Sequence, residues 1–304
     1  MSRSSNPNIS TASLTVLALV AFAANSVLCR LALAEPIIDP ASYTAVRLIT
    51  GAITLWLIAA FLRRRSFAKS GGSWISASML FLYAATFSFA YISLSAGTGA
   101  LILFASVQIT MIAVGLYTGE RPAMLEWLGL FIAIAGLIYL VSPGITAPSI
   151  VGSLLMATAG IAWGVYSLRG RGASDPVGVT ADNFLRTVPL AIGLVLSLAS
   201  ALTITPMGFV WAALSGSITS GVGYVLWYAA LRGLTATRAA TVQLAVPVIA
   251  ALGGVIVLSE AINLRLIVSA VVILTGVGLA VAHHQTTADR RESIPRTPTR
   301  SIKE

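Results

Sequence analysis

The side chains best suited to hold a small molecule are aromatic ones inside long apolar runs of the sequence. Tyr83, Phe87 and Tyr91 recur at intervals of four, which places them on one face of a helix. Trp163 and Tyr224 lie deep in two other apolar runs. Aromatic faces stack on planar apolar groups, and Tyr and Trp also carry a polar atom that forms hydrogen bonds. Such residues bind a solute without transforming it.

Uncharged polar side chains occur in the same runs. Asn25 and Ser26 share a helical face with Phe22. Amides are costly in lipid unless they are partnered, so Gln108 and Gln243 either bond to another helix or face a wet cavity. The candidate substrate-binding residues are therefore Asn25, Ser26, Tyr83, Phe87, Gln108, Trp163, Tyr224 and Gln243. The alternative is that aromatic stripes pack helices or lie at the lipid headgroups, and we favour it for Trp227 and Tyr228.

Two arginines, Arg47 and Arg186, are the ionisable residues placed well inside apolar runs. An ionisable residue within a membrane span is by default a functional candidate, and a guanidinium can hold a substrate carboxylate. Each arginine nevertheless lies about two turns from a helix end, from where a long side chain can extend to water. We therefore expect both to have a structural role.

The remaining reactive residues form no catalytic or metal-binding pattern. There is one cysteine, Cys29, and the two histidines, His283 and His284, are adjacent at the end of an apolar run. The ten acidic residues are scattered among loops and tails, and none lies near the middle of a span. The sequence thus predicts no enzyme, no metal, no cofactor and no proton relay at the membrane midplane. An uncharged aromatic cavity suits a neutral or zwitterionic solute with an apolar side chain.

Composition places these runs in a membrane. Of 304 residues, 57% are hydrophobic and 10% charged, and the mean hydropathy is +0.90. The net charge of +9 resides in short basic clusters between apolar runs, the densest being "RRRSFAK" at 63–69. Such clusters orient helices in a bilayer, so we expect lipid, and no nucleic acid, as the large partner.

The lengths of the charge-free stretches predict ten membrane-spanning helices, because a helix needs about 20 apolar residues to cross the hydrocarbon. Several stretches are twice that length and contain turn residues near the middle, such as "SAGTG" at 95–99. The predicted spans are 13–34, 41–62, 73–92, 98–117, 124–141, 150–168, 179–200, 208–230, 236–258 and 264–283.

The distribution of basic residues predicts the orientation of these spans. With the N-terminus inside, 15 of the 19 Lys and Arg residues fall on the inner side. Both termini are then cytoplasmic, in a multi-pass protein of a bacterial inner membrane. The first twelve residues form an N-terminal tail, and residues 284–304, rich in Thr, Arg and Pro, are expected to be disordered.

An internal repeat divides the spans into two sets of five. Glu120 in "LYTGERP" matches Glu260, 140 residues later, and the same offset places Gly136 on Gly276. Because five is odd, the second copy, 150–283, enters the membrane inverted relative to the first, 13–141. Each glutamate stands where a span ends, so both are expected to mark helix ends and not to relay protons.

This arrangement, with "GE" or "SE" closing the fourth span of each half and "AG" or "TG" in the fifth, resembles the drug/metabolite transporter superfamily, specifically its EamA-type members. Within it the chain looks most like bacterial aromatic and neutral amino-acid exporters of the YddG type. The resemblance implies solute export by alternating access of the two repeats, as a monomer or weak homo-oligomer. Pro247 departs from the repeat, since Val107 is its counterpart, and we class it with Glu120, Glu260 and the two arginines as gating or structural. One alternative is an exporter of another metabolite or drug of the same superfamily, and the alternative from another class is a channel or a membrane enzyme.

Overall fold

The computed structural model describes residues 11–35, 37–62, 71–117, 119, 124–144, 146–170, 173–231, 234 and 242–292. Within these ranges the chain is helical and forms no strand beyond an isolated bridge between Ile38 and Ile204. The first half contains α1 (Thr11–Leu33), α2 (Pro40–Leu62), α3 (Trp74–Ala90), α4 (Ala96–Tyr117) and α5 (Met124–Val141). The second contains α6 (Ile150–Gly170), α7 (Pro176–Ser197), the 3-10 turn η1 (Ala199–Ala201), α8 (Pro206–Leu214), the π-helical segment η2 (Ser215–Val222), α9 (Gly223–Leu231), α11 (Ala245–Leu258) and α12 (Leu264–Glu292).

In the part of the chain that the structure describes, ten apolar helical segments correspond to the ten predicted spans. Six are long and apolar enough to cross a membrane, one of them being the continuous run α8–η2–α9 over Pro206–Leu231. The other four are shorter apolar helices within α3, α5, α11 and α12. The all-helical, multi-pass prediction is therefore confirmed at this level.

Two predicted boundaries need comment. The predicted start of the ninth span, residue 236, lies outside the described residues, which resume at 242, where a short helical stretch precedes a turn at Leu244 and α11 begins at Ala245. The predicted disordered tail begins at 284, whereas α12 continues as a helix to Glu292. Apolar composition locates the part of a helix that lies in lipid, and it does not show that the same helix continues into water.

Helix starts follow capping residues in the sequence. Ser73 accepts a hydrogen bond from the Ser76 amide at the start of α3, and Asp175 accepts one from the Gly178 amide at the start of α7. Asp175 is followed directly by a proline, whose missing N–H leaves no helical bond unmade at this position. These caps fix where each helix enters the bundle.

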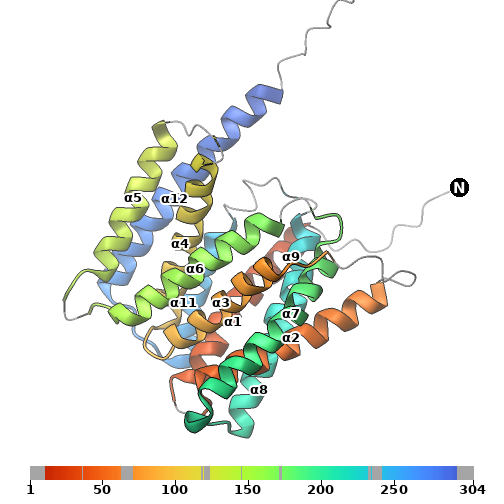
Figure 1. Ribbon diagram of the computed structural model, residues 1–304. Coiled ribbons are helices and arrows are strands. Elements are labelled where there is room, and N and C mark those ends of the chain that lie inside the picture. The colour runs from red at the N-terminus through yellow and green to blue at the C-terminus, as the bar shows by residue number, and fades with distance from the viewer. Residues whose placement is uncertain are drawn as a thin grey trace, which may run out of the picture.

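The two halves of the chain interdigitate. The largest helix contacts join α5 to α12, α3 to α6, α2 to α7 and α4 to α6, and each of these pairs takes one helix from before residue 142 and one from after residue 149. α1 packs against α9, α11 and η2 near the centre. Figure 1 shows α5 and α12 together at one side of the bundle, and α1, α2, α3, α7 and α9 in a second group.

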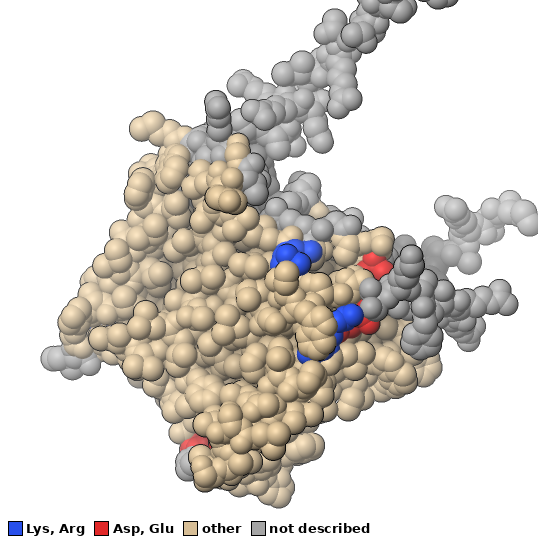
Figure 2. Space-filling view, viewed as in Figure 1, with Lys and Arg blue, Asp and Glu red and all other residues tan. Residues whose placement is uncertain are grey.

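The outer surface is apolar. Figure 2 shows a broad tan face, with the described charged side chains in a few small patches. Large exposed side chains such as Phe131 and Leu154 belong to this surface, at 62% and 65% exposure. Lipid tails are the environment in which such a surface is stable.

The backbones of α2 and η2 approach closely at Gly216. A Cβ at Gly216 would lie 2.0 Å from Thr50 Oγ1 and 2.2 Å from the carbonyl oxygen of Arg47. We expect Gly216→Ala to destabilise the protein by about 1–3 kcal/mol, because neither helix can yield without disturbing the core. Thermal melting in detergent measures this. Gly193→Ala is the control, since nothing lies within 4 Å of a Cβ there, and an unchanged melting temperature for Gly216→Ala would contradict the tight approach.

Candidate substrate site

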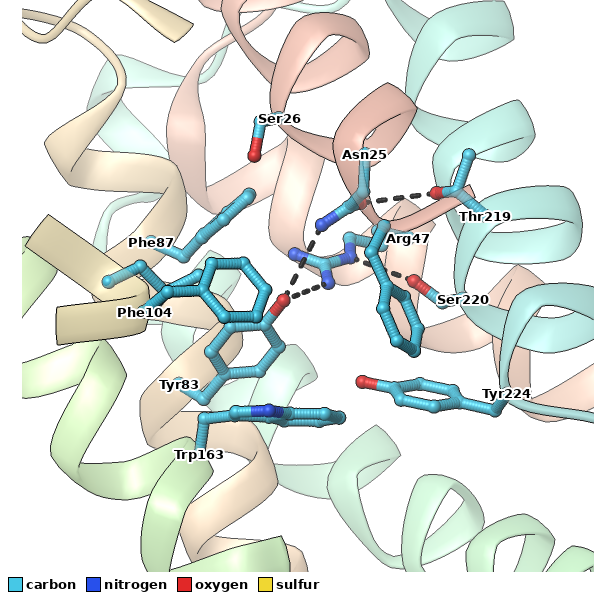
Figure 3. Close-up of a pocket in the computed structure, with 12 residues that line it drawn as sticks. Asn25, Ser26, Arg47, Tyr83, Phe87, Phe104, Trp163, Thr219, Ser220 and Tyr224 are labelled. Atoms are coloured by element: carbon cyan, nitrogen blue, oxygen red, sulfur yellow. Dashed lines mark hydrogen bonds between the residues drawn. The ribbon is translucent and has the colours of Figure 1, made fainter. Parts of the chain in front are cut away.

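A central cavity lies between the two halves of the chain, where six of the predicted substrate-binding residues meet. We call it the central cavity, and Figure 3 shows its lining. Its lining residues are Phe22, Asn25, Ser26, Arg47, Tyr83, Phe87, Leu103, Phe104, Trp163, Thr219, Ser220 and Tyr224. They come from α1, α2, α3, α4, α6, η2 and α9. Its interior volume is about 20 Å³, which is room for about one water molecule.

Aromatic rings form one wall of the central cavity. Trp163 of α6 stacks on Tyr224 of α9, with ring centroids 5.2 Å apart and an interplanar angle of 26°. Tyr83 of α3 contacts Trp163 at 5.0 Å and Phe87 at 5.4 Å. Phe22 contacts Tyr224 at 6.0 Å. The wall therefore offers stacking faces from both halves of the chain to a planar apolar group.

A polar network opposes this wall. Asn25 donates from Nδ2 to the Tyr83 hydroxyl at 3.4 Å, and its Oδ1 accepts from Ser215 Oγ at 2.7 Å and Thr219 Oγ1 at 3.2 Å. Arg47 donates from Nη2 to the same Tyr83 hydroxyl at 3.0 Å and from Nε to Ser220 Oγ at 3.2 Å. These bonds tie α1, α2 and α3 to η2, and they fix the orientation of the Asn25 amide.

Arg47 lies inside the bundle, and the expectation that its side chain extends to water is wrong. Only 2% of the residue is exposed, and its guanidinium carbon lies 5.0 Å from the Phe87 ring centroid and 5.2 Å from that of Tyr83. Arg186, its counterpart in the second half, is half-buried and donates to the Asp182 carbonyl at 3.2 Å. Arg186 is not part of the central cavity lining.

The two predicted glutamines do not line the central cavity. Gln108 is buried on α4, at 5% exposure, and Gln243 is half-buried shortly before α11 begins. The predicted substrate-binding set did not include six of the twelve lining residues, namely Phe22, Arg47, Leu103, Phe104, Thr219 and Ser220. Leu103 and Phe104 carry no signal that separates them from lipid-facing residues of an all-apolar helix.

The π-helical segment η2 supplies the polar side of the central cavity. Its sequence, "SGSITSGV", contains Ser215, Thr219 and Ser220, all of which bond to Asn25 or Arg47. A π-helix is wider than an α-helix and is frequent at functional sites. The small residues also allow α2 to approach, since a Cβ at Gly221 would lie 2.9 Å from Thr54 Cγ2.

Polar contacts join the helices on both sides of the central cavity, toward the two ends of the bundle. Toward one end, Arg30 pairs with Glu260 at 3.2 Å and donates to the carbonyls of Tyr91 and Ile92, while Glu260 Oε2 accepts from the Ala96 amide at 2.9 Å. We call these five residues the Arg30–Glu260 cluster. Toward the other end, Arg169 of α6 donates to the hydroxyls of Ser76 and Ser73 at the start of α3.

The other gating or structural candidates take different positions. Pro247 lies in the first turn of α11. In a continuous helix its ring would clash with the carbonyl of Gln243, four residues earlier, and the helix is interrupted at Leu244. Glu260 follows the left-handed residue Ser259, which has a φ of 53° and caps α11. Glu120 lies outside the described residues.

Comparison with known proteins assigns the family. A model of the EamA-like transporter family matches residues 9–142 and again residues 150–282. An uncharacterised protein of Pseudomonas aeruginosa is 48% identical over 276 residues, which cover 91% of this chain and 96% of that protein. An uncharacterised transporter of Archaeoglobus fulgidus is 27% identical over 293 residues, which cover 91% of this chain and 100% of that protein.

One solved crystal structure shares the fold. It has a TM-score of 0.65 at 20% identity and covers 90% of this chain and 99% of its own. The family matches extend over nearly all of the helices that surround the central cavity. The chain belongs to the EamA-like transporter family, and its aromatic cavity is therefore the interior of a multi-pass membrane transporter.

Proposed function

We propose that this protein exports small neutral amino acids, aromatic ones included, by alternating access of two inverted repeats around the central cavity. The observation that carries the proposal is the stacked pair Trp163 and Tyr224, which brings together rings from α6 and α9 beside a polar network on α1, α2 and η2. An aromatic face beside a few fixed hydrogen-bonding groups is the usual form of a site for a small, partly apolar solute.

The stacked pair also indicates how a substrate would be held. A ring between two facing rings needs about 7 Å, twice a contact distance of about 3.5 Å. The centroids of Trp163 and Tyr224 lie 5.2 Å apart, so they would separate by roughly 2 Å to admit one. An interior of about 20 Å³ holds about one water molecule, so this separation of the two rings is needed before an amino acid can bind.

The helix contacts support the inverted repeat. In an inverted repeat, each helix of the first half corresponds to the helix five spans later, and a contact between two helices should recur between their counterparts. The counterpart of the contact α3–α6 is the contact between α8–η2–α9 and α1, and the counterpart of α4–α6 is α11–α1. Both contacts of each such pair are present, and the contacts α2–α7 and α5–α12 each join a helix to its own counterpart. The family model matches each half separately, over 9–142 and 150–282. We therefore assign the repeats to 13–141 and 150–283.

The central cavity supports transport without an obligatory proton. None of its lining residues, all within the described chain, carries a carboxylate, so they include no group of the kind that exchanges protons for cationic solutes. The bacterial relative from Pseudomonas aeruginosa supports placement in a bacterial inner membrane, and the basic clusters favour cytoplasmic termini. The YddG-type subfamily remains our proposal for the closest functional class.

Counterflow in proteoliposomes tests this function. We expect vesicles loaded with unlabelled phenylalanine to accumulate labelled phenylalanine well above empty vesicles, and to do so without a proton gradient. Threonine, a dicationic drug and a nucleotide sugar complete the panel. Equal counterflow in vesicles with and without protein would contradict the substrate, whereas strict dependence on a proton gradient would contradict only the mechanism.

A further inference from the structure

The charge of Arg47 is uncompensated inside the protein. Its described partners are the hydroxyls of Tyr83 and Ser220 and two aromatic faces, all of them neutral. Among the described residues, no carboxylate pairs with Arg47. The ion pair in the described residues joins Arg30 to Glu260. Its Nη1 is buried and donates to no residue in the described chain.

Such an arrangement is unfavourable unless something else binds there. A guanidinium held away from water loses its hydration, and neutral hydroxyls replace only part of that stabilisation. The donor left over, Nη1, belongs to a planar group whose adjacent N–H bonds match the two oxygens of a carboxylate. Arg47 also lines the central cavity, so an anionic group in the cavity reaches it without crossing the protein.

We propose that Arg47 binds the carboxylate of the transported solute, and that the site selects the carboxylate over the ammonium group. The inference rests on the proposed function, since it concerns a solute bound in the central cavity. It reverses the structural role expected for Arg47 from the sequence, and it makes Arg47 a substrate-binding residue.

The rest of the polar network explains why the ammonium group contributes less. An ammonium needs hydrogen-bond acceptors or a negative charge. The Oδ1 of Asn25 already accepts from Ser215 and Thr219, and the Tyr83 hydroxyl already receives bonds from Asn25 and Arg47. The lining residues carry one positive charge and no negative one, so a solute with net negative charge complements the central cavity better than a cation.

Three aromatic compounds of matched size distinguish binding of the carboxylate from binding of the ammonium group. Phenylalanine has both groups. Phenyllactate keeps the carboxylate and replaces the ammonium by a hydroxyl, and phenylalaninol keeps the ammonium and loses the carboxylate. Binding to the purified wild-type protein is measured by calorimetry and by ligand-induced thermal stabilisation. We expect phenyllactate to bind at least as tightly as phenylalanine and phenylalaninol to bind at least tenfold more weakly.

Two variants assign that preference to Arg47. In Arg47→Gln we expect the ratio between phenylalanine and phenylalaninol affinities to fall to about threefold or less, while Arg186→Gln, outside the central cavity, keeps the wild-type ratio. If Arg47→Gln does not fold, the wild-type series still decides whether the carboxylate is selected, and Arg47→Lys, which keeps the charge, then tests the residue.

The outcomes for the function and for the inference are distinct. Equal binding of phenylalanine and phenylalaninol to the wild type, or an unchanged ratio in Arg47→Gln, would overturn the inference and leave amino-acid transport standing. Failure of all three compounds to bind would contradict the proposed function itself.

Discussion

Replacement of Trp163 by alanine is expected to lower phenylalanine counterflow by at least tenfold. Trp163 touches Tyr83, Tyr166 and Tyr224, so it joins the rings contributed by three helices. Without it a bound aromatic ring loses one of its two stacking faces, which costs about 1.5–3 kcal/mol of apolar burial and stacking together. Since each 1.4 kcal/mol is about a factor of ten in affinity, the loss corresponds to about 10- to 100-fold.

The control for this prediction is a second tryptophan in the same chain. Trp127 of α5 stacks on Phe131 at 6.0 Å with the same interplanar angle of 26°, and it is 39% exposed, away from the central cavity. Trp127→Ala should retain counterflow. If both variants are expressed and folded, and Trp163→Ala transports as well as Trp127→Ala, the assignment of the aromatic wall as the substrate site is wrong.

The elements of this fold were largely predictable because lipid imposes a length on every span. Runs without charge had to be about 20 residues long, and turn residues divided the longer ones. The predicted span 124–141 coincides with α5, and that at 41–62 differs from α2 by one residue. The break at Leu244, before α11, was not predicted because the surrounding run gives no turn signal there.

The direction in which each side chain points was harder to predict. A helix that is apolar on all sides gives no periodic signal that separates the face toward the protein from the face toward lipid. Polar and aromatic residues such as Asn25 and Tyr83 could be found because lipid disfavours them or because they repeat. Phe104 of α4 could not be found in this way, and Gln108, four residues along, does not line the central cavity.

Arg47 shows that the depth of a residue in a span does not give the direction of its side chain. Its distance from the helix end is compatible both with reaching water and with pointing inward. The direction depends on which face of α2 meets η2, and that contact is fixed by Gly216 and Gly221 more than 160 residues later in the chain. The widened π-helical turn that receives the guanidinium also has no sequence signature apart from a density of Ser and Gly.

The helix α1 connects the central cavity to the Arg30–Glu260 cluster. Asn25 and Ser26 line the central cavity, Cys29 lies one turn further along the same helical face, and Arg30 follows it. Cys29 is fully buried, at 0% exposure, and it is the one cysteine of the sequence. If the bundle opens at the Arg30–Glu260 cluster, the path to the central cavity exposes the Cys29 thiol. The reactivity of Cys29 therefore measures how often this end is open.

We accordingly expect Glu260→Ala to increase the rate at which a small thiol reagent modifies Cys29 by about tenfold. Glu260 accepts from both Arg30 and the Ala96 amide, and hydrogen bonds to a charged group contribute about 1.5–3 kcal/mol each. Part of this is recovered from water when the end opens, and a net loss of about 1.4 kcal/mol raises the open population tenfold. The rate is measured by mass spectrometry on detergent-purified protein, with size-exclusion profiles to show that the variant stays folded.

Two control variants accompany this measurement. Glu35→Ala removes an exposed carboxylate near the same end of the bundle and should leave the modification rate unchanged. Cys29→Ser removes the thiol and should abolish the modification. A rate in Glu260→Ala equal to that in Glu35→Ala would mean that the Arg30–Glu260 cluster holds helices together without controlling access to the central cavity.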